Sequence, residues 1–171
     1  MHGPAQGGRR KKKTQYRMLL EEKQKVRFNY GVSERQLRRY VERARRSSEP
    51  TGEALLMLLE SRLDNVVYRL GFAPTIPAAR QLVAHGHIRL NARKVDRPAH
   101  QVVPGDEISL SETGRQIPYV AQLLHSGPAY PVPGHLLVDA PSATGRMVSA
   151  PPRDSVSVVV REAAIVEFYA R

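Results

Sequence analysis

The sequence of 171 residues contains no cysteine. It therefore has no disulfide framework, no thiolate zinc site and no cysteine nucleophile. No run of about 18 apolar residues occurs, so no segment is predicted to span a membrane, and the N-terminus lacks the apolar core of a secretory signal. The phosphate-binding loop, the nucleophile elbow and the dinucleotide-binding glycine pattern are absent as well. These absences exclude several classes of enzyme and favour a binding protein.

Positive charge is what the sequence has in excess, with a net +11 at neutral pH. Residues 1–50 hold 15 Lys or Arg but only 5 Asp or Glu, whereas the two signs nearly balance over the rest of the chain. A positive field concentrated in one part of a chain suits a polyanion, and nucleic acid is the commonest polyanionic partner.

The first residues form a basic segment that contains several glycines. Residues 1–13 end in Arg9-Arg10-Lys11-Lys12-Lys13 and offer little apolar surface to bury. We therefore expect a flexible tail that stays extended or disordered until it meets phosphate groups. A helix is predicted to follow from a cap at Thr14 to Tyr30, because Gly31 provides a stop.

A second helix is predicted after Ser33, which forms a capping box with Gln36. Its apolar residues recur on one face between Leu37 and Ala44. Its arginines fall mostly on the other face: Arg35, Arg38, Arg39, Arg43, Arg45 and Arg46. The nearby glutamates are too few to neutralise all of them. Since a guanidinium group binds phosphate through two parallel hydrogen bonds, this face is predicted to contact phosphates.

Two helices and a strand are predicted in the middle of the chain. The apolar residues between 55 and 70 lie on one helical face, and Gly71 ends that helix. A further helix begins near Pro77 and ends at Gly86, and a strand follows at 88–90. Two helices packed in an L beside a strand would form a compact platform for the grooves of folded RNA.

The remaining patterns predict a small antiparallel sheet with additional helix. Residues 88–90, 102–103 and 107–110 are predicted strands, and a helix is predicted over 115–125. Further strands are expected at 136–138 and, from β-branched composition, at 156–160. The fold class is therefore predicted to be α+β. It joins a basic helical N-terminal domain to a domain with the L-shaped two-helix module and a small antiparallel β-sheet.

His85 and His87 flank the predicted helix stop and have three interpretations. They form a weak metal site, because no cysteine and no nearby carboxylate complete a ligand pattern. Contact with RNA phosphate or sugar from the end of the helix is the functional alternative. Packing of one ring with solvation of the other is the structural alternative. No metal and no cofactor is expected.

Asp64 is the one acid whose surroundings invite a catalytic interpretation, since some pseudouridine-forming enzymes use a single aspartate beside a similar RNA-binding module. No room remains here for a large catalytic domain, so we expect Asp64 to orient Arg62 or Asn65, or to pair with a neighbouring arginine. Tyr30 and Tyr40 lie on apolar stripes, which favours core packing over stacking on bases.

Several motifs resemble the family of bacterial-type small-subunit ribosomal protein four. They occupy residues 22–31, 33–36, 59–72 and 166–171, in family order. Residues 74–77, Pro-Thr-Ile-Pro, resemble the cyanobacterial and plastid versions. The chain begins where the family's usual N-terminal segment, sometimes zinc-binding, should already have ended, so that segment is expected to be missing.

The resemblance implies a structural, non-enzymatic protein of the small ribosomal subunit. Family members bind small-subunit rRNA at a multi-helix junction, nucleate assembly of this ribonucleoprotein and sit near the mRNA entrance beside the fifth small-subunit protein. The implied location is the ribosome in a bacterial cytoplasm or a plastid interior, with no membrane. The implied domains are the tail 1–13, a helical rRNA-binding domain 14–54 joined by 161–171, and the module with its sheet over 55–160.

The candidate RNA-binding residues combine the basic tail with positions carried over by motif. They are Arg9, Arg10, Lys11, Lys12, Lys13, Tyr16, Lys23, Lys25, Arg27, Arg35, Arg38, Arg39, Arg62, Asn65, Arg69, Arg80, Gln81, His85 and His87.

One departure from the family concerns a hairpin turn, because its usual Asn-Gly appears here as Asn91-Ala92. Alanine is disfavoured at positive φ, so a different turn type is expected. Two rival functions remain open at this point. The first is a free-standing RNA-binding translational regulator that uses the same module, and the second is an RNA-modifying enzyme.

Overall fold

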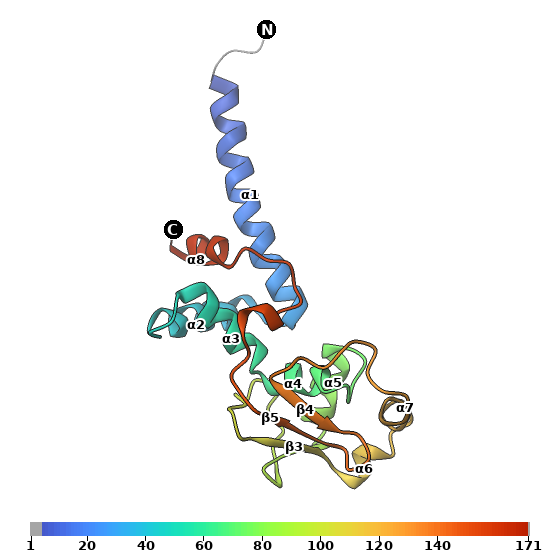
Figure 1. Cartoon of the computed structure of the whole chain (residues 1–171). Helices are drawn as coiled ribbons and strands as arrows, with labels where there is room; N and C mark the ends of the chain where they lie inside the picture. Colours follow the sequence, from blue (N-terminus) through green and yellow to red (C-terminus); the bar gives the residue numbers. More distant parts are fainter. Residues whose placement is uncertain (1–4, 171) are drawn as a thin grey trace. The chain divides into compact units, whose positions relative to one another are not determined.

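The computed structural model describes the backbone of residues 5–170 and the side chains of residues 14–170 (Figure 1). The chain divides into two compact units, one made of residues 1–56 and 157–171 and the other of residues 57–156. Residues 1–4 and 171, which belong to the predicted tail and the predicted C-terminal segment, lie outside the described residues. The α+β prediction is confirmed, since helices accompany a five-stranded antiparallel sheet.

The first unit begins with one long helix, α1, over Ala5–Tyr30 (blue in Figure 1). The predicted extended tail is therefore wrong for the backbone of residues 5–13, where the helix continues nine residues before Thr14. Arginine and lysine are good helix formers and no proline interrupts this stretch, so the helix propagates through it. The side chains of Arg9 to Lys13 lie outside the described residues.

Helix α2, Glu34–Arg45, begins with the predicted capping box. The Gln36 N–H donates to the Ser33 hydroxyl at 3.1 Å, and the Ser33 N–H donates to the Gln36 side chain at 2.9 Å. The helix buries Leu37, Val41 and Ala44 on one face, as their spacing predicts.

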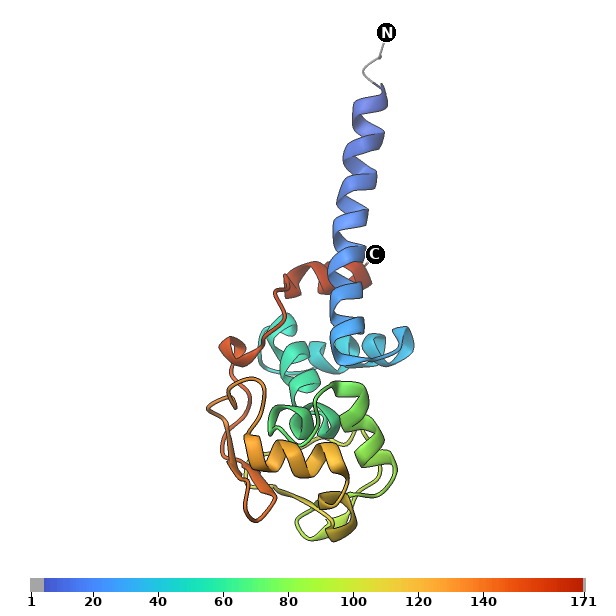
Figure 2. The same ribbon diagram turned by 90° about the vertical axis from the view of Figure 1, so that its right-hand side faces the viewer.

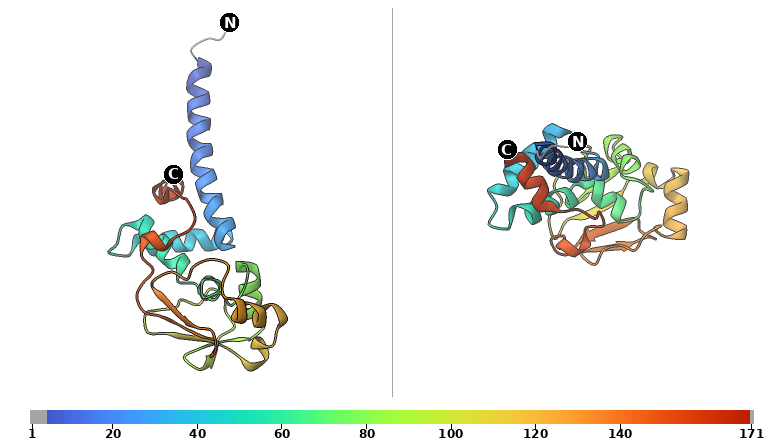
Figure 3. Two further views of the ribbon diagram at one scale, coloured as in Figure 1. Left: turned by 45° about the vertical axis from the view of Figure 1, so that its right-hand side comes forward. Right: turned by 90° about the horizontal axis from the view of Figure 1, so that it is seen from above.

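The C-terminal helix α8, Glu162–Ala170, packs against α1 and α2 within this unit (Figure 3). The strand predicted at 156–160 is wrong, because a 3-10 turn, Arg153–Ser155, and an irregular segment lead into α8. Of the β-branched side chains in that segment, Val160 is buried and Val159 is 87% exposed. β-branched composition gives a strand only where a neighbouring strand pairs with it, and no strand of the described sheet does so.

The single helix predicted between 55 and 70 is wrong, since the structure has two, α3 (Thr51–Glu60) and α4 (Leu63–Arg69). The break lies at Ser61–Arg62. There the N–H groups of Leu63 and Asp64 donate to the carbonyls of His100 and Pro98, at 2.8 and 3.1 Å. Contacts with a distant segment replace the intrahelical bonds at this point, which apolar periodicity alone does not reveal.

Helix α5, Ile76–Ala84, packs against α4 and matches its prediction. Thr75 caps its first turn by accepting the Ala78 N–H at 3.2 Å. Gly86, at φ 80°, allows the chain to reverse after the helix, and strand β1 follows at Ile88–Leu90. The L-shaped module of two helices and a strand is thus present in the second unit.

The sheet is antiparallel in the order β2-β1-β3-β5-β4. Its other strands are β2 (Arg93–Lys94), β3 (Glu107–Leu110), β4 (Leu136–Asp139) and β5 (Thr144–Met147). No strand forms at residues 102–103. The helix predicted over 115–125 forms as α7 (Pro118–Ser126; Figure 2, gold), and a separate one-turn helix, α6 (Glu112–Arg115), precedes it. The core of this unit joins apolar side chains of α4, α5 and the sheet.

The hairpin between β1 and β2 has both turn residues at positive φ, Asn91 at 51° and Ala92 at 66°. The expectation of a different turn type is therefore wrong, because positive φ at both positions is the signature of the tight type I′ turn. Asn91 holds this geometry: its side chain donates to Asp106 at 2.8 Å and accepts the Glu107 N–H at 2.9 Å. Ala92 is carried into a conformation that alanine disfavours.

Candidate nucleic-acid interface

Helix α2 presents a row of arginines to solvent because its opposite face is buried. The exposed members are Arg35, Arg38, Arg39, Arg43 and Arg45, and Arg46 follows at the C-cap. The guanidinium carbon of Arg38 lies 5.9 Å from the centre of the Tyr169 ring, which places one arginine over an aromatic surface. Exposed guanidinium groups on one helix face can bind successive phosphates of a nucleic acid.

A cluster around Glu34 joins α1, α2 and α8 and contains two of the candidate cations. Lys23 donates to Glu34 at 2.7 Å, and Arg27 lies 3.6 Å from the same carboxylate. The Tyr169 hydroxyl donates to the other carboxylate oxygen at 2.6 Å. Lys23 also lies over the Phe168 ring, with its nitrogen 4.5 Å from the ring centre. Since only 5% of Lys23 is exposed, it ties the helices together and has little surface for RNA.

The protonation behaviour of this cluster follows from its contacts. Burial acts to raise the pKa of Glu34, but the hydrogen bonds from Lys23 and Tyr169 and the nearby positive charges outweigh it and lower the pKa. Burial and the hydrogen bond to the Glu34 carboxylate raise the pKa of Tyr169. Near neutral pH, the Glu34 carboxylate is therefore ionised and the Tyr169 phenol is neutral.

The other α1 candidates lie closer to solvent. Lys25 is exposed and pairs with Glu22 at 2.9 Å, and Glu22 also accepts the Arg161 N–H at 3.0 Å. Tyr16 is half exposed, and its ring centre lies 6.0 Å from that of Phe168. Tyr30, in contrast, is buried in the core, as its apolar stripe predicts.

A buried ion pair in the second unit accounts for Asp64. The Arg62 guanidinium, 2% exposed, donates through Nε and Nη2 to the two oxygens of the Asp64 carboxylate, at 3.1 and 3.0 Å. Asp64 accepts the Asn65 N–H at 2.7 Å, and Arg80 reaches the same carboxylate at 3.5 Å. The expectation that Asp64 orients its neighbours is confirmed. A fully buried carboxylate of this kind has no access to a substrate.

Glu60 is the second buried acid of this unit, and it holds two further candidates. Asn65 donates from its side chain to the Glu60 carbonyl at 2.9 Å and to the carboxylate at 2.8 Å. Arg69 donates to the carboxylate at 3.0 Å and to the Ser155 carbonyl at 3.1 Å. Both Asn65 and Arg69 are therefore engaged inside the protein.

The exposed polar candidates of the second unit surround the end of α5. Gln81 and His85 are exposed, Arg80 and His87 are partly exposed, and Gly86 lies between the two histidines. A β-carbon added to Gly86 would lie 2.3 Å from the Lys94 side chain, so glycine lets the β2 lysine approach this turn. Within the described part of the chain, no group of three potential ligands of the His, Cys, Asp or Glu type gathers to hold a metal.

Sequence reasoning missed three exposed cations of the β1–β2 hairpin, namely Arg89, Arg93 and Lys94. Arg89 and Lys94 are paired across the two strands. The alternation of Arg89 with buried Ile88 and Leu90 was the signal that could have identified the first of them, because alternate strand residues face opposite sides.

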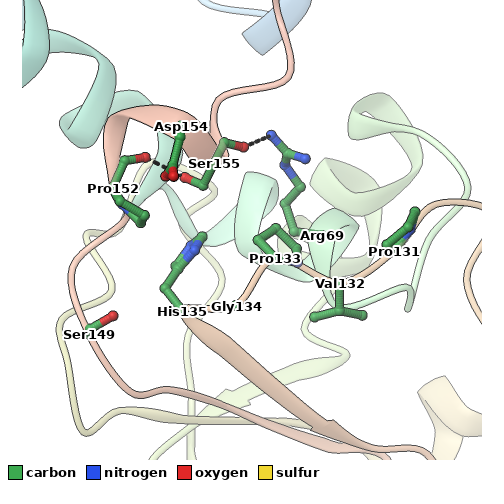
Figure 4. Close-up of a pocket in the computed structure, with 10 residues that line it drawn as sticks. All are labelled: Arg69, Pro131, Val132, Pro133, Gly134, His135, Ser149, Pro152, Asp154 and Ser155. Atoms are coloured by element: carbon green, nitrogen blue, oxygen red, sulfur yellow. Dashed lines mark hydrogen bonds between the residues drawn. The ribbon is translucent and has the colours of Figure 1, made fainter.

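A pocket of about 520 Å³ lies between the segment 131–135 and the segment 149–155 of the second unit (Figure 4). Arg69 and His135 line it, and the His135 ring points toward the loop of Asp154 and Ser155 (Figure 4). His135 is buried, and neither ring nitrogen has a hydrogen-bond partner among the described residues. Burial lowers the pKa of His135, so the ring is neutral at pH 7.

Comparison with known proteins decides the family. The family model of the ribosomal protein S4/S9 N-terminal domain matches residues 2–60, and that of the S4 domain matches residues 61–108. A small ribosomal subunit protein uS4 from Thermosynechococcus vestitus is 52% identical over 169 residues, which cover 98% of this chain and 84% of that protein. The chain belongs to the uS4 family. It is accordingly a structural protein of the small ribosomal subunit and not an enzyme.

Other uS4 relatives are about as similar. The protein from Natranaerobius thermophilus is 48% identical over 99% of this chain and 80% of its own length. The plastid-type uS4c of Rhodomonas salina is 48% identical over 96% of this chain and 82% of its own length. The resemblance based on motifs is thus confirmed, and the RNA-modifying alternative is wrong. Among the described helices, none is long and apolar enough to cross a membrane.

Proposed function

We propose that this uS4-family protein binds small-subunit rRNA at a multi-helix junction, and that it thereby nucleates assembly of the subunit and helps form the mRNA entrance. The fifth small-subunit protein and mRNA are its proposed neighbours there. The subunit is that of a bacterial cytoplasm or of a plastid. The observation that supports this best is the arginine face of α2, where five guanidinium groups are exposed on one short helix and a sixth follows at its C-cap.

The RNA-contacting residues are proposed from exposure. In the first unit they are Arg35, Arg38 and Arg39 of α2, with Lys25, Arg27 and Tyr16 of α1; in the second they are Arg80, Gln81, His85 and His87, with the hairpin cations Arg89, Arg93 and Lys94. Arg9, Arg10, Lys11, Lys12 and Lys13 are proposed phosphate contacts on grounds of charge alone.

Four candidates are proposed to support this surface from within the protein. Lys23, Arg62, Asn65 and Arg69 are mostly or fully buried and bonded to acids or backbone carbonyls. Removing Arg62, Asn65 or Arg69 would take a hydrogen-bond donor from the buried acids Asp64 or Glu60, which is costly. They act by fixing the helices that carry the exposed cations.

The salt dependence of binding tests the proposed α2 contacts. Each phosphate contact that is lost reduces the slope of log affinity against log salt by roughly 0.7 to 0.9. We expect the triple variant Arg35→Ala, Arg38→Ala, Arg39→Ala to flatten the slope by about 2 for an in vitro transcript of the 5′ domain of small-subunit rRNA. Arg146→Ala is the matched control, because Arg146 is exposed but pairs with Glu107 in the second unit. An unchanged slope in the triple variant would place the contacts elsewhere.

A free-standing RNA-binding regulator with the same module is the second candidate function. Co-sedimentation separates the two, since a subunit protein remains with small subunits through a salt wash and a regulator does not.

Base-pair swaps that preserve the junction should change affinity by less than tenfold, about 1.4 kcal/mol, because A-form RNA hides its base edges in a deep groove. Tight binding to an isolated single strand, with no preference for the junction, would favour the regulator.

A further inference from the structure

We propose that Phe28 is a stacking platform for one unpaired nucleobase of the bound RNA. Phe28 lies near the end of α1 and is 76% exposed, more than any other aromatic side chain among residues 14–170. The proposal rests on the proposed RNA-binding function and adds to it a contact with a base, whereas the cations of α1 and α2 are proposed to contact phosphates.

The fold does not use the Phe28 ring. The core face of α1 is formed by Leu19, Val26 and Tyr30, all nearly inaccessible to solvent. Phe28 points away from that face, so replacing it opens no cavity and breaks no described hydrogen bond. An aromatic side chain with no role in packing is available for a ligand.

The charge beside the ring suits a nucleic acid. The guanidinium carbon of Arg27 lies 5.9 Å from the ring centre. Arg27 is fixed in place by Gln24 at 3.0 Å, by the Val32 carbonyl at 3.4 Å and by Glu34 at 3.6 Å. Because Glu34 also neutralises Lys23, two cations share one carboxylate and a positive charge remains next to the ring.

A base fits this position better than an apolar surface of another protein. The helix neighbours of Phe28 toward solvent are polar, Lys25 and Asn29, both exposed. The ring is therefore isolated, whereas an apolar protein interface needs a contiguous patch. A flat base needs only one ring face and a nearby positive charge, and such stacking tolerates any base identity because every base has a π-face. The base must be unpaired, since bases inside a duplex are already stacked on their neighbours.

Tryptophan fluorescence tests the contact directly, because the natural chain contains no tryptophan. The Phe28→Trp variant should bind the 5′-domain rRNA transcript with wild-type affinity, and its emission should be quenched on binding. A fully paired duplex should quench it far less. Tyr130→Trp is the matched control, since Tyr130 is 69% exposed in the other unit and should show no such quenching.

Affinity measurements on ring-deletion variants complete the test. Phe28→Ala and Phe28→Leu should both weaken binding by about 5- to 150-fold, the effect of losing one stacked base. Leucine keeps an apolar side chain but has no ring face, so equal losses in the two variants identify stacking. The melting temperature of both variants should be unchanged or higher. The stacking proposal is overturned if Phe28→Ala and Phe28→Leu both bind with wild-type affinity and the indole emission of Phe28→Trp is not quenched. The proposed rRNA binding would stand in that case. Failure of the wild-type chain to bind the transcript overturns the proposed function itself.

Discussion

Removal of the Arg62 guanidinium is expected to destabilise the second unit severely. Arg62 and Asp64 are almost completely buried, and two hydrogen bonds of 3.0 and 3.1 Å join them. In Arg62→Ala, the Asp64 carboxylate would keep, among the contacts of the described residues, the Asn65 N–H and the more distant Arg80 at 3.5 Å. Breaking a buried ion pair from one side costs about 3–5 kcal/mol. That is a large share of the roughly 5–15 kcal/mol by which a small domain is stable.

Urea unfolding followed by circular dichroism measures this loss, with two variants for comparison. Arg80 is 39% exposed in its side chain, so Arg80→Ala should cost about 1 kcal/mol or less, since exposed ion pairs contribute little. The double variant Arg62→Leu, Asp64→Leu removes both charges and should recover most of the loss, because no charge is then buried alone. A free energy of unfolding for Arg62→Ala within about 1 kcal/mol of wild type would refute the framework role. If Arg62→Ala kept wild-type stability but bound RNA more weakly, Arg62 would be a direct RNA contact.

Three further predictions concern single residues. Ala92→Gly should raise the free energy of unfolding by about 0.5–1 kcal/mol. Glycine removes the steric strain of alanine at positive φ, and this gain exceeds the stability lost because glycine makes the unfolded chain more flexible. A lower melting temperature would contradict this prediction. Gly71→Ala should lower the melting temperature more than Gly105→Ala, since both glycines have positive φ but only Gly71 has a rigid neighbour, the Pro128 ring, in the way. His135 has a pKa below its ordinary value of 6.5, so the unfolded chain takes up a proton that the native chain does not, and stability should fall as pH drops below about 6.5. Thermal melts from pH 7.5 to 5 should show a smaller fall for His135→Phe, and equal falls would refute this coupling.

The parts of the fold that local chemistry determines could be predicted from the sequence. Ser33 and Gln36 lie three residues apart, and the side chain of each accepts the backbone N–H of the other, so the capping box at the start of α2 needs no distant partner. The break between α3 and α4 depends instead on carbonyls at 98 and 100, which no local pattern reveals. The candidate RNA-binding residues could not be sorted into buried and exposed ones for the same reason. Arg62 and Arg80 look alike in sequence, but only the packing of the module shows that Arg62 is buried and Arg80 is partly exposed.

The discontinuity of the first unit has a consequence for the order in which the chain folds during its own synthesis. The second unit is contiguous, so residues 57–156 are all synthesised before α8 and need no later segment to complete their own unit. The first unit needs α8, which is synthesised after the whole second unit, to cover α1 and complete the Glu34 cluster through Tyr169. The basic helices α1 and α2 are therefore synthesised before the second unit, but they receive their last partner after it. During that interval, the cations of α1 and α2 are available to polyanions before the helices have their final partner.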